Sequence, residues 1–157
     1  MGEHRTDRLL RELVHDPYKS KRKLAEPSVC RDCGVVYLDG RWTSKPAPAD
    51  AQETTCPACR RTQDQVPAGF LTLSGEFLAQ HRDEITGLIH NIEARERAAH
   101  PLKRIMGLEE HEGKLVVTFT DPHLARTVGD AIGHAYGGEV DFDYQKDEYL
   151  LRVNWSR

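Results

Sequence analysis

Apolar residues recur at helical spacing through one long stretch near the middle of the chain. A leucine or isoleucine stands at every seventh position, and further apolar residues fall on the same side. This side consists of Phe77, Leu78, Ile85, Leu88, Ile89 and Ile92. Ser74 is a favourable N-cap residue, and Pro101 cannot continue a helix. The pattern predicts an amphipathic helix that begins at Ser74 and ends near residue 99.

Apolar and polar residues alternate after this helix. The alternation predicts four strands, over residues 103–109, 115–120, 139–144 and 148–155. Between the two pairs of strands, Asp121 and Pro122 open a second amphipathic helix, which ends at Tyr136 before Gly137 and Gly138. The predicted fold class is α+β: a long helix followed by a ββαββ module. We expect a four-stranded, mostly antiparallel sheet with the helices on one face.

Two Cys-x-x-Cys pairs, Cys30 with Cys33 and Cys56 with Cys59, contain all four cysteines of the chain. Two residues between thiolates let one tight turn direct both sulfurs at a single ion, and two such turns complete a tetrahedral Zn²⁺ shell. Between the pairs, Asp39-Gly40 is typical of a type I′ hairpin turn. A hairpin and two cysteine pairs make a zinc ribbon. Four protein ligands leave no position for water, so we expect a structural ion.

Other uses of the cysteines are weaker hypotheses. Two disulfides would need an oxidising compartment, and a thioredoxin-like pair would need a βαβ setting. An iron–sulfur cluster also uses four thiolates, but short turns with Gly34 and Pro57 favour zinc. The sequence shows no leader pattern and no apolar run long enough to cross a bilayer. We therefore expect a cytoplasmic protein without a membrane partner.

Charge is distributed unevenly along the 157 residues, whose formal net charge is −3. Lysine and arginine outnumber acidic residues in residues 1–65, and acidic residues dominate after residue 66. The densest basic cluster consists of Lys19, Lys21, Arg22 and Lys23. We expect residues 1–27 to be a basic arm, disordered alone, that folds on an anionic partner; a solvated tail is the alternative. Residues 28–66 then form the zinc ribbon, and residues 67–157 the helix and ββαββ domain, after a hinge at 66–69.

Cationic and aromatic side chains flank the predicted metal site. The candidate contacts for RNA are Arg31, Arg41, Trp42, Arg60 and Arg61, together with the basic cluster of the arm. Guanidinium groups bind phosphates, and an aromatic ring stacks on unpaired bases. The alternative is that Trp42 covers the small core of the ribbon. No catalytic constellation or phosphate-binding glycine loop is present, so we expect a non-enzymatic protein without a small-molecule substrate.

Several motifs resemble one known family. They are residues 29–34, Tyr37, residues 40–42, residues 56–59, residues 115–128 and residues 149–153. Their combination is similar to the zinc-ribbon region and the following strand–helix–strand module of the ribosomal large-subunit export adaptor family of archaea and eukaryotes. Short bacterial proteins of unassigned role share this layout, and this chain resembles such a bacterial relative. The resemblance implies binding to the ribosome, to its large subunit in particular, and to ribosomal RNA.

The sequence therefore leads to one main functional hypothesis and two alternatives. The main hypothesis is a zinc-ribbon protein that binds the ribosome and its RNA, as a factor that blocks or protects idle ribosomes. The first alternative is a protein–protein adaptor that docks through its acidic C-terminal module. The second is a redox sensor that releases zinc when its thiolates are oxidised. The oligomeric state is left open.

Overall fold

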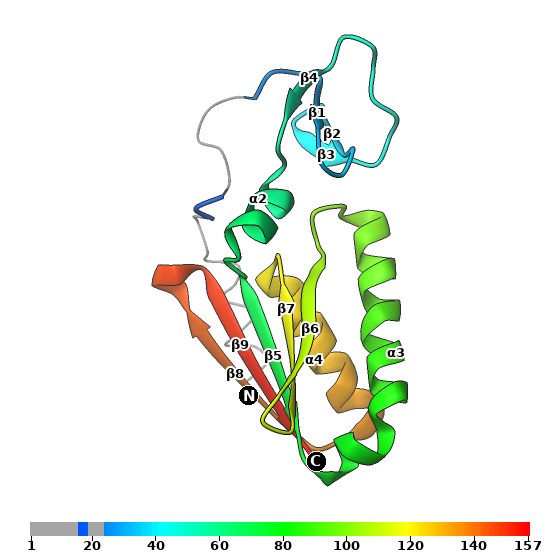
Figure 1. The fold of residues 1–157 in the computed structure, drawn as a ribbon, viewed down its shortest axis with the longest axis vertical. Helices are drawn as coiled ribbons and strands as arrows, with labels where there is room; N and C mark the ends of the chain where they lie inside the picture. The colour runs from blue at the N-terminus through cyan, green and yellow to red at the C-terminus, as the bar shows by residue number, and fades with distance from the viewer. Residues whose placement is uncertain (1–15, 19–23) are drawn as a thin grey trace.

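The computed structural model describes residues 16–18 and 24–157 (Figure 1). Within these ranges the chain forms three α-helices and two mixed sheets, so the α+β class is as predicted. The basic cluster at Lys19, Lys21, Arg22 and Lys23 lies outside the described residues, as does most of the predicted arm. None of the described helices combines the length and the apolar character that crossing a bilayer requires.

The larger sheet has five strands in the order β6-β7-β5-β9-β8. They are β5 (Gly69–Ser74), β6 (Ile105–His111), β7 (Lys114–Phe119), β8 (Glu139–Gln145) and β9 (Leu150–Ser156). Four of them lie close to the predicted strands. The central strand β5 was not predicted, and it pairs antiparallel with β7 and parallel with β9. The sheet is mostly antiparallel, as expected, with β5 and β9 as its one parallel pair, but the expected number of four strands is wrong because β5 adds a fifth.

Strand β5 runs from the last residue of the expected hinge, Gly69, to the predicted helix start, Ser74. Its inward residues Gly69, Leu71 and Leu73 alternate with outward ones, but Pro67 and Gly69 suggest a break in structure. Its two neighbours, β7 and β9, come much later in the chain. The long helix begins at Glu76, and its N-cap is Gly75 rather than the predicted Ser74.

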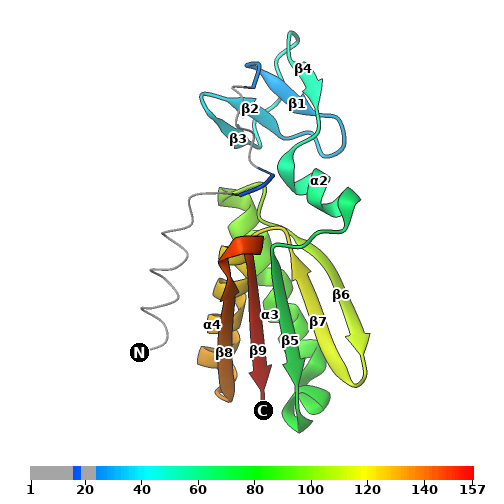
Figure 2. The same ribbon diagram turned by 90° about the vertical axis from the view of Figure 1, so that its left-hand side faces the viewer.

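Helices α3 (Glu76–Ala99) and α4 (Pro122–Tyr136) cover one face of the larger sheet (Figure 2). The side chain of Asp121 caps α4 by accepting hydrogen bonds from the N–H groups of His123 and Leu124. The side chains at the centre of the core between helices and sheet are fully buried. They are Leu71, Ile85, Ile89, Phe119, Leu124, Val128 and Leu151. Burial of these apolar groups is the main stabilising term of this part of the chain.

The smaller sheet has four short strands in the order β3-β2-β1-β4. They are β1 (Ser28–Cys30), β2 (Val36–Leu38), β3 (Arg41–Thr43) and β4 (Gln52–Thr54), and helix α2 (Pro57–Asp64) follows. The predicted hairpin joins β2 to β3, with Asp39 and Gly40 at φ angles of 54° and 78°. The sequence did not reveal β1, β4 or α2. Strands β1 and β4 pair in parallel, which places the start of α2 beside the end of β1.

The smaller sheet lies beyond one end of the larger sheet, and α2 leads from one to the other (Figures 1 and 2). Its core is small and contains three buried cysteines with Val35 and Ala58. Leu102, from the segment between α3 and β6, packs against this core. A residue of the later part of the chain thus completes the interior of the earlier part.

The position of β5 predicts the effect of a substitution there. Leu71 is fully buried, so Leu71→Ala should lower the free energy of unfolding by about 2–5 kcal/mol. Thr72→Ala, on the outward side of the same strand, should change it by about 0.5 kcal/mol. Urea unfolding followed by circular dichroism measures both. Equal effects of the two substitutions would contradict the central, buried position of β5.

Candidate metal centre

The four cysteines meet at the base of the smaller sheet, although they come from two separate segments. Cys30 ends β1, Cys33 lies in the turn after it, Cys56 caps α2 and Cys59 stands in the first turn of α2. Their sulfur atoms all lie within 4.8 Å of one another, and none forms a disulfide. This arrangement can hold a metal ion.

Local backbone geometry directs the sulfurs inward. Gly34 takes a φ angle of 84°, a conformation that glycine adopts without strain, and its N–H donates to the carbonyl of Cys30. The N–H of Cys56 donates to Sγ of Cys30 at 3.2 Å, and the N–H of Cys59 donates to Sγ of Cys56 at 3.3 Å. Backbone donors of this kind stabilise thiolates and orient them as ligands.

The spacing of the sulfurs fits a tetrahedral ion. A shell with metal–sulfur bonds of about 2.3 Å places neighbouring sulfurs about 3.8 Å apart. Sγ of Cys33 and Sγ of Cys56 are 3.7 Å apart. Four thiolates would complete such a shell and leave no position for water or substrate, so an ion held here would serve structure rather than catalysis.

Burial makes the cluster difficult to ionise without a cation. It raises the pKa of Cys56 and of Cys59. For Cys30, burial also raises the pKa, but the backbone N–H groups around the sulfur outweigh it and bring the value to about 7. Several negative charges can therefore occupy this small volume only if positive charge lies beside them.

Arg104 supplies such a positive charge from the other part of the chain, and the sequence did not indicate it. It precedes β6, is 8% exposed, and its guanidinium donates to Sγ of Cys33 at 3.0 Å and to Sγ of Cys59 at 3.4 Å. The Nε group of Arg104 donates to the carbonyl of Pro101 at 2.9 Å, which fixes the direction of the side chain. Burial alone would lower the pKa of Arg104, but its bonds to the two cysteines raise it, so the guanidinium stays charged.

Arg61, one of the expected RNA contacts, has a different role in the structure. It is 2% exposed and forms an ion pair with Asp16 at 2.7 Å. Its guanidinium also donates to the carbonyl of Val66 and lies over the ring of Tyr18, 4.3 Å from the centroid. Arg61 therefore joins residues 16–18 to α2 and does not face the solvent.

The other expected contacts that the structure describes lie on the surface. Arg31, Arg41 and Arg60 are exposed, and within the described residues none of their side chains forms a hydrogen bond or ion pair. Trp42 is half-buried: it packs against the cysteine core, and its ring centroid lies 5.3 Å from that of Tyr37. One part of the Trp42 side chain therefore covers the core, and another part is accessible to solvent.

The chain has no match among family models, curated proteins or solved structures. The resemblance to the export adaptor family therefore depends on short sequence motifs alone, in the cysteine-containing segment and in the later strand–helix–strand stretch.

The cysteine cluster predicts the metal content of the purified protein. We expect about one divalent ion per chain and loss of that ion in Cys56→Ser, because oxygen replaces one of four sulfurs. Thr55→Ser, at the neighbouring position, should keep the ion. Inductively coupled plasma mass spectrometry measures the content. An unchanged metal content in Cys56→Ser would contradict a metal site formed by the four cysteines.

The position of Arg104 predicts a second effect on metal binding. Arg104→Met removes the charge and the donors to the sulfurs, so the affinity for the ion should fall about 10–100-fold. Arg82→Gln removes a partly exposed arginine that pairs with Glu110 on the surface, and it should leave the affinity unchanged. Competition with a chromophoric chelator measures both. An unchanged affinity in a folded Arg104→Met protein would show that the guanidinium does not stabilise the bound ion.

Proposed function

We propose that this protein holds a structural Zn²⁺ ion between its four cysteines and binds ribosomal RNA with the surface around that ion. Zinc is the ion that suits four thiolates in a closed tetrahedral shell. Because the shell has no open position, the ion would act by folding the smaller sheet, whose own apolar core is too small to do so. The proposed activity is binding and not catalysis.

One observation carries the RNA proposal: Arg41, Arg60 and Trp42 line the same pocket. Both arginines are exposed, and neither has an ion-pair partner within the described residues. Unpaired guanidinium groups bind phosphate through charge-assisted hydrogen bonds, and an accessible tryptophan offers a stacking surface for an unpaired base. Single-stranded RNA, which presents both phosphates and unstacked bases, fits this combination.

The basic segment of the arm can add to this surface. Tyr18 and Leu24, the described residues on either side of residues 19–23, both line the same pocket. The four cations Lys19, Lys21, Arg22 and Lys23 lie between these two residues in the sequence. The proposal therefore includes the basic cluster as part of a binding arm, with the solvated tail as the alternative.

The resemblance to the export adaptor family suggests which RNA is bound. It points to the large ribosomal subunit as the partner. For a bacterial relative without a nucleus to export from, the transferable part of the family's role is contact with the subunit. We therefore propose a factor that binds ribosomes, including idle ones that it blocks or protects.

Co-sedimentation with ribosomes tests this proposal. Wild-type protein should travel with the large subunit through a sucrose gradient at physiological salt. The triple variant Arg31→Gln, Arg41→Gln, Arg60→Gln should remain at the top, because three phosphate contacts are lost. A matched triple variant that removes the same charge elsewhere, Arg82→Gln, Arg95→Gln, Lys114→Gln, should sediment like the wild type. Wild-type protein that stays at the top would refute ribosome binding.

The salt dependence of RNA binding tests the role of the arm separately. Each phosphate contact with single-stranded RNA contributes about −0.7 to the slope of log affinity against log salt, so five contacts give about −3.5. Replacing Lys21, Arg22 and Lys23 by glutamine should make the slope shallower by about 2. Fluorescence anisotropy with a labelled oligonucleotide measures it. An unchanged slope would assign those lysines and arginine to the solvated tail.

One observation favours the protein–protein adaptor as a second candidate. The edge strand β8 presents exposed Glu139, Asp141 and Asp143 on one side, which repels RNA and suits a basic protein partner. A complex formed through this strand would survive nuclease treatment. It would also be lost when the three acidic residues are replaced by their amides.

A further inference from the structure

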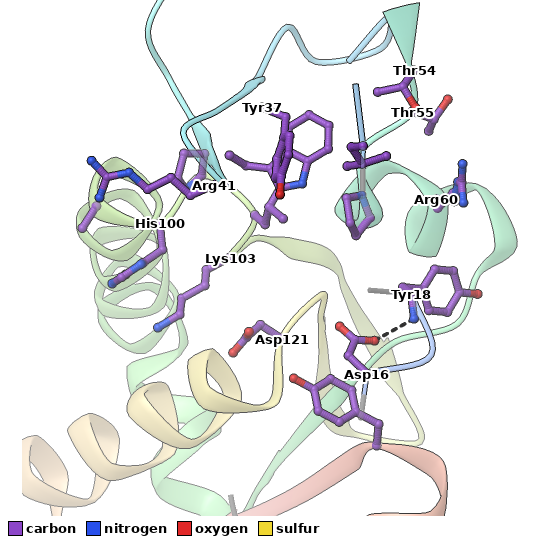
Figure 3. Close-up of a pocket in the computed structure, with 18 residues that line it drawn as sticks. Asp16, Tyr18, Tyr37, Arg41, Thr54, Thr55, Arg60, His100, Lys103 and Asp121 are labelled. Atoms are coloured by element: carbon purple, nitrogen blue, oxygen red, sulfur yellow. Dashed lines mark hydrogen bonds between the residues drawn. The ribbon is translucent and has the colours of Figure 1, made fainter. Parts of the chain in front are cut away.

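A pocket of about 660 Å³ lies where the smaller sheet faces the larger one (Figure 3). Its walls come from β2, β3 and α2 on one side and from the segment after α3, the cap of α4 and Tyr149, which precedes β9, on the other. The volume is within the range of small-molecule sites, about 300–1,000 Å³. We call it the inter-sheet pocket.

The wall formed by the smaller sheet is largely apolar and aromatic. Tyr37 and Trp42 stand side by side with their rings inclined at 56°, and Pro57 continues this wall. Leu102 lines the pocket from the other side of the junction. A flat, apolar group of the ligand can be covered here and removed from water.

Two carboxylates face this wall from the opposite side. Figure 3 shows Asp16 and Asp121 together across the pocket from Tyr37. Asp16 uses Oδ1 to accept from Arg61 and from the N–H of Tyr18, and Asp121 uses Oδ1 to cap α4. Within the described residues, Oδ2 of neither carboxylate accepts a hydrogen bond. Oδ2 is therefore the oxygen of each carboxylate that a ligand's N–H groups would approach, while Oδ1 of Asp121 also lies 3.3 Å from Nδ1 of His123.

Tyr149 lies beside these carboxylates as a further polar group. Burial raises its pKa, and the negative charges of Asp121 and Asp16 raise it further. The hydroxyl is therefore a neutral donor at every physiological pH. Acceptors and one donor together can recognise the edge of a heterocyclic ring.

Positive charge is concentrated at the sides of the pocket. Figure 3 shows Arg41 and Arg60 on opposite sides, with His100 and Lys103 below Arg41. Arg41 and Arg60 have no ion pair within the described residues, whereas Lys103 is 3.8 Å from Glu96. An anionic group at either side of the mouth would meet a guanidinium group that has no ion-pair partner among the described residues.

We propose that the inter-sheet pocket binds a nucleoside phosphate. The planar base lies against Tyr37 and Trp42, its amino and imino N–H groups donate to Asp16 and Asp121, and its phosphate meets Arg41 or Arg60. An acidic peptide would place its carboxylates against the two aspartates, and a basic peptide would be repelled by the two arginines. Only a ligand with N–H donors at one end and an anion at the other matches both.

This ligand chemistry has two sources. A free nucleotide would make the pocket a small-molecule site, independent of the proposed function. A nucleotide within RNA would make it the base-binding part of the proposed RNA surface, and in that case the inference depends on the proposed function. The probes of the test separate the two.

Calorimetric titration of the full-length, metal-loaded protein tests the proposal. The probes are GMP, AMP, guanosine, inorganic phosphate and a five-nucleotide RNA. We expect GMP or AMP to bind at least tenfold more tightly than guanosine or phosphate, because only the nucleotide uses both ends of the pocket. An RNA that binds more tightly than either mononucleotide identifies RNA as the source, and equal or weaker binding identifies the free nucleotide.

Three variants connect the binding to this pocket. Arg60→Gln, at an exposed position, should weaken GMP binding about tenfold by removing a charge-assisted hydrogen bond. Asp121→Asn should alter the preference between GMP and AMP, because a carboxylate only accepts hydrogen bonds whereas the asparagine amide also donates them. Arg95→Gln, an exposed arginine of α3 outside the pocket, is the control and should bind like the wild type. Metal content and circular dichroism verify that each variant is folded.

The proposal would be overturned if neither a mononucleotide nor the RNA bound, or if GMP and phosphate bound with equal affinity. Equal weakening by Arg60→Gln and Arg95→Gln would also overturn it, since binding would then follow net charge. Mononucleotide binding by a protein that stays at the top of the ribosome gradient would support the pocket and refute the ribosomal function. The two claims can therefore fail separately.

Discussion

Charge neutrality at the cysteine cluster is the constraint on which the rest of the structure depends. Burial opposes the ionisation of Cys56 and Cys59, so thiolates can gather there only beside positive charge. The guanidinium of Arg104 supplies part of it through contacts with Cys33 and Cys59, and a metal ion held by the four cysteines would supply the rest. Because Arg104 belongs to the segment before β6, the same contacts hold the larger sheet against the smaller one.

The inter-sheet pocket is a consequence of this junction. One wall belongs to the smaller sheet, where Trp42 packs against the cysteine core, and the other belongs to the segment that carries Arg104. Anything that dismantles the cysteine cluster would also separate the two walls. In the proposed function, a structural ion would act without chemistry of its own by keeping Arg41, Arg60 and Trp42 opposite Asp16 and Asp121.

The sequence predicted those features that depend on near neighbours. The helix from Pro122 to Tyr136, the hairpin at Asp39-Gly40 and the two cysteine pairs all carry their signals within a few residues. It failed where distant segments meet. Strand β5 pairs with β7 and β9, Arg104 reaches cysteines far earlier in the chain, and Arg61 is buried by residues 16–18. An arginine that neutralises a thiolate and one that faces solvent look alike in a sequence; only the fold distinguishes Arg61 and Arg104 from Arg60.

Amide hydrogen exchange of the protein with and without its metal ion tests the central claim most directly. If the ion and Arg104 join the two sheets, removal of the ion should abolish protection in β1, β2, α2 and residues 101–104. Strands β5, β7 and β9, whose core contains no cysteine, should keep their protection. Unchanged protection in the smaller sheet and at residues 101–104 after metal removal would contradict the account.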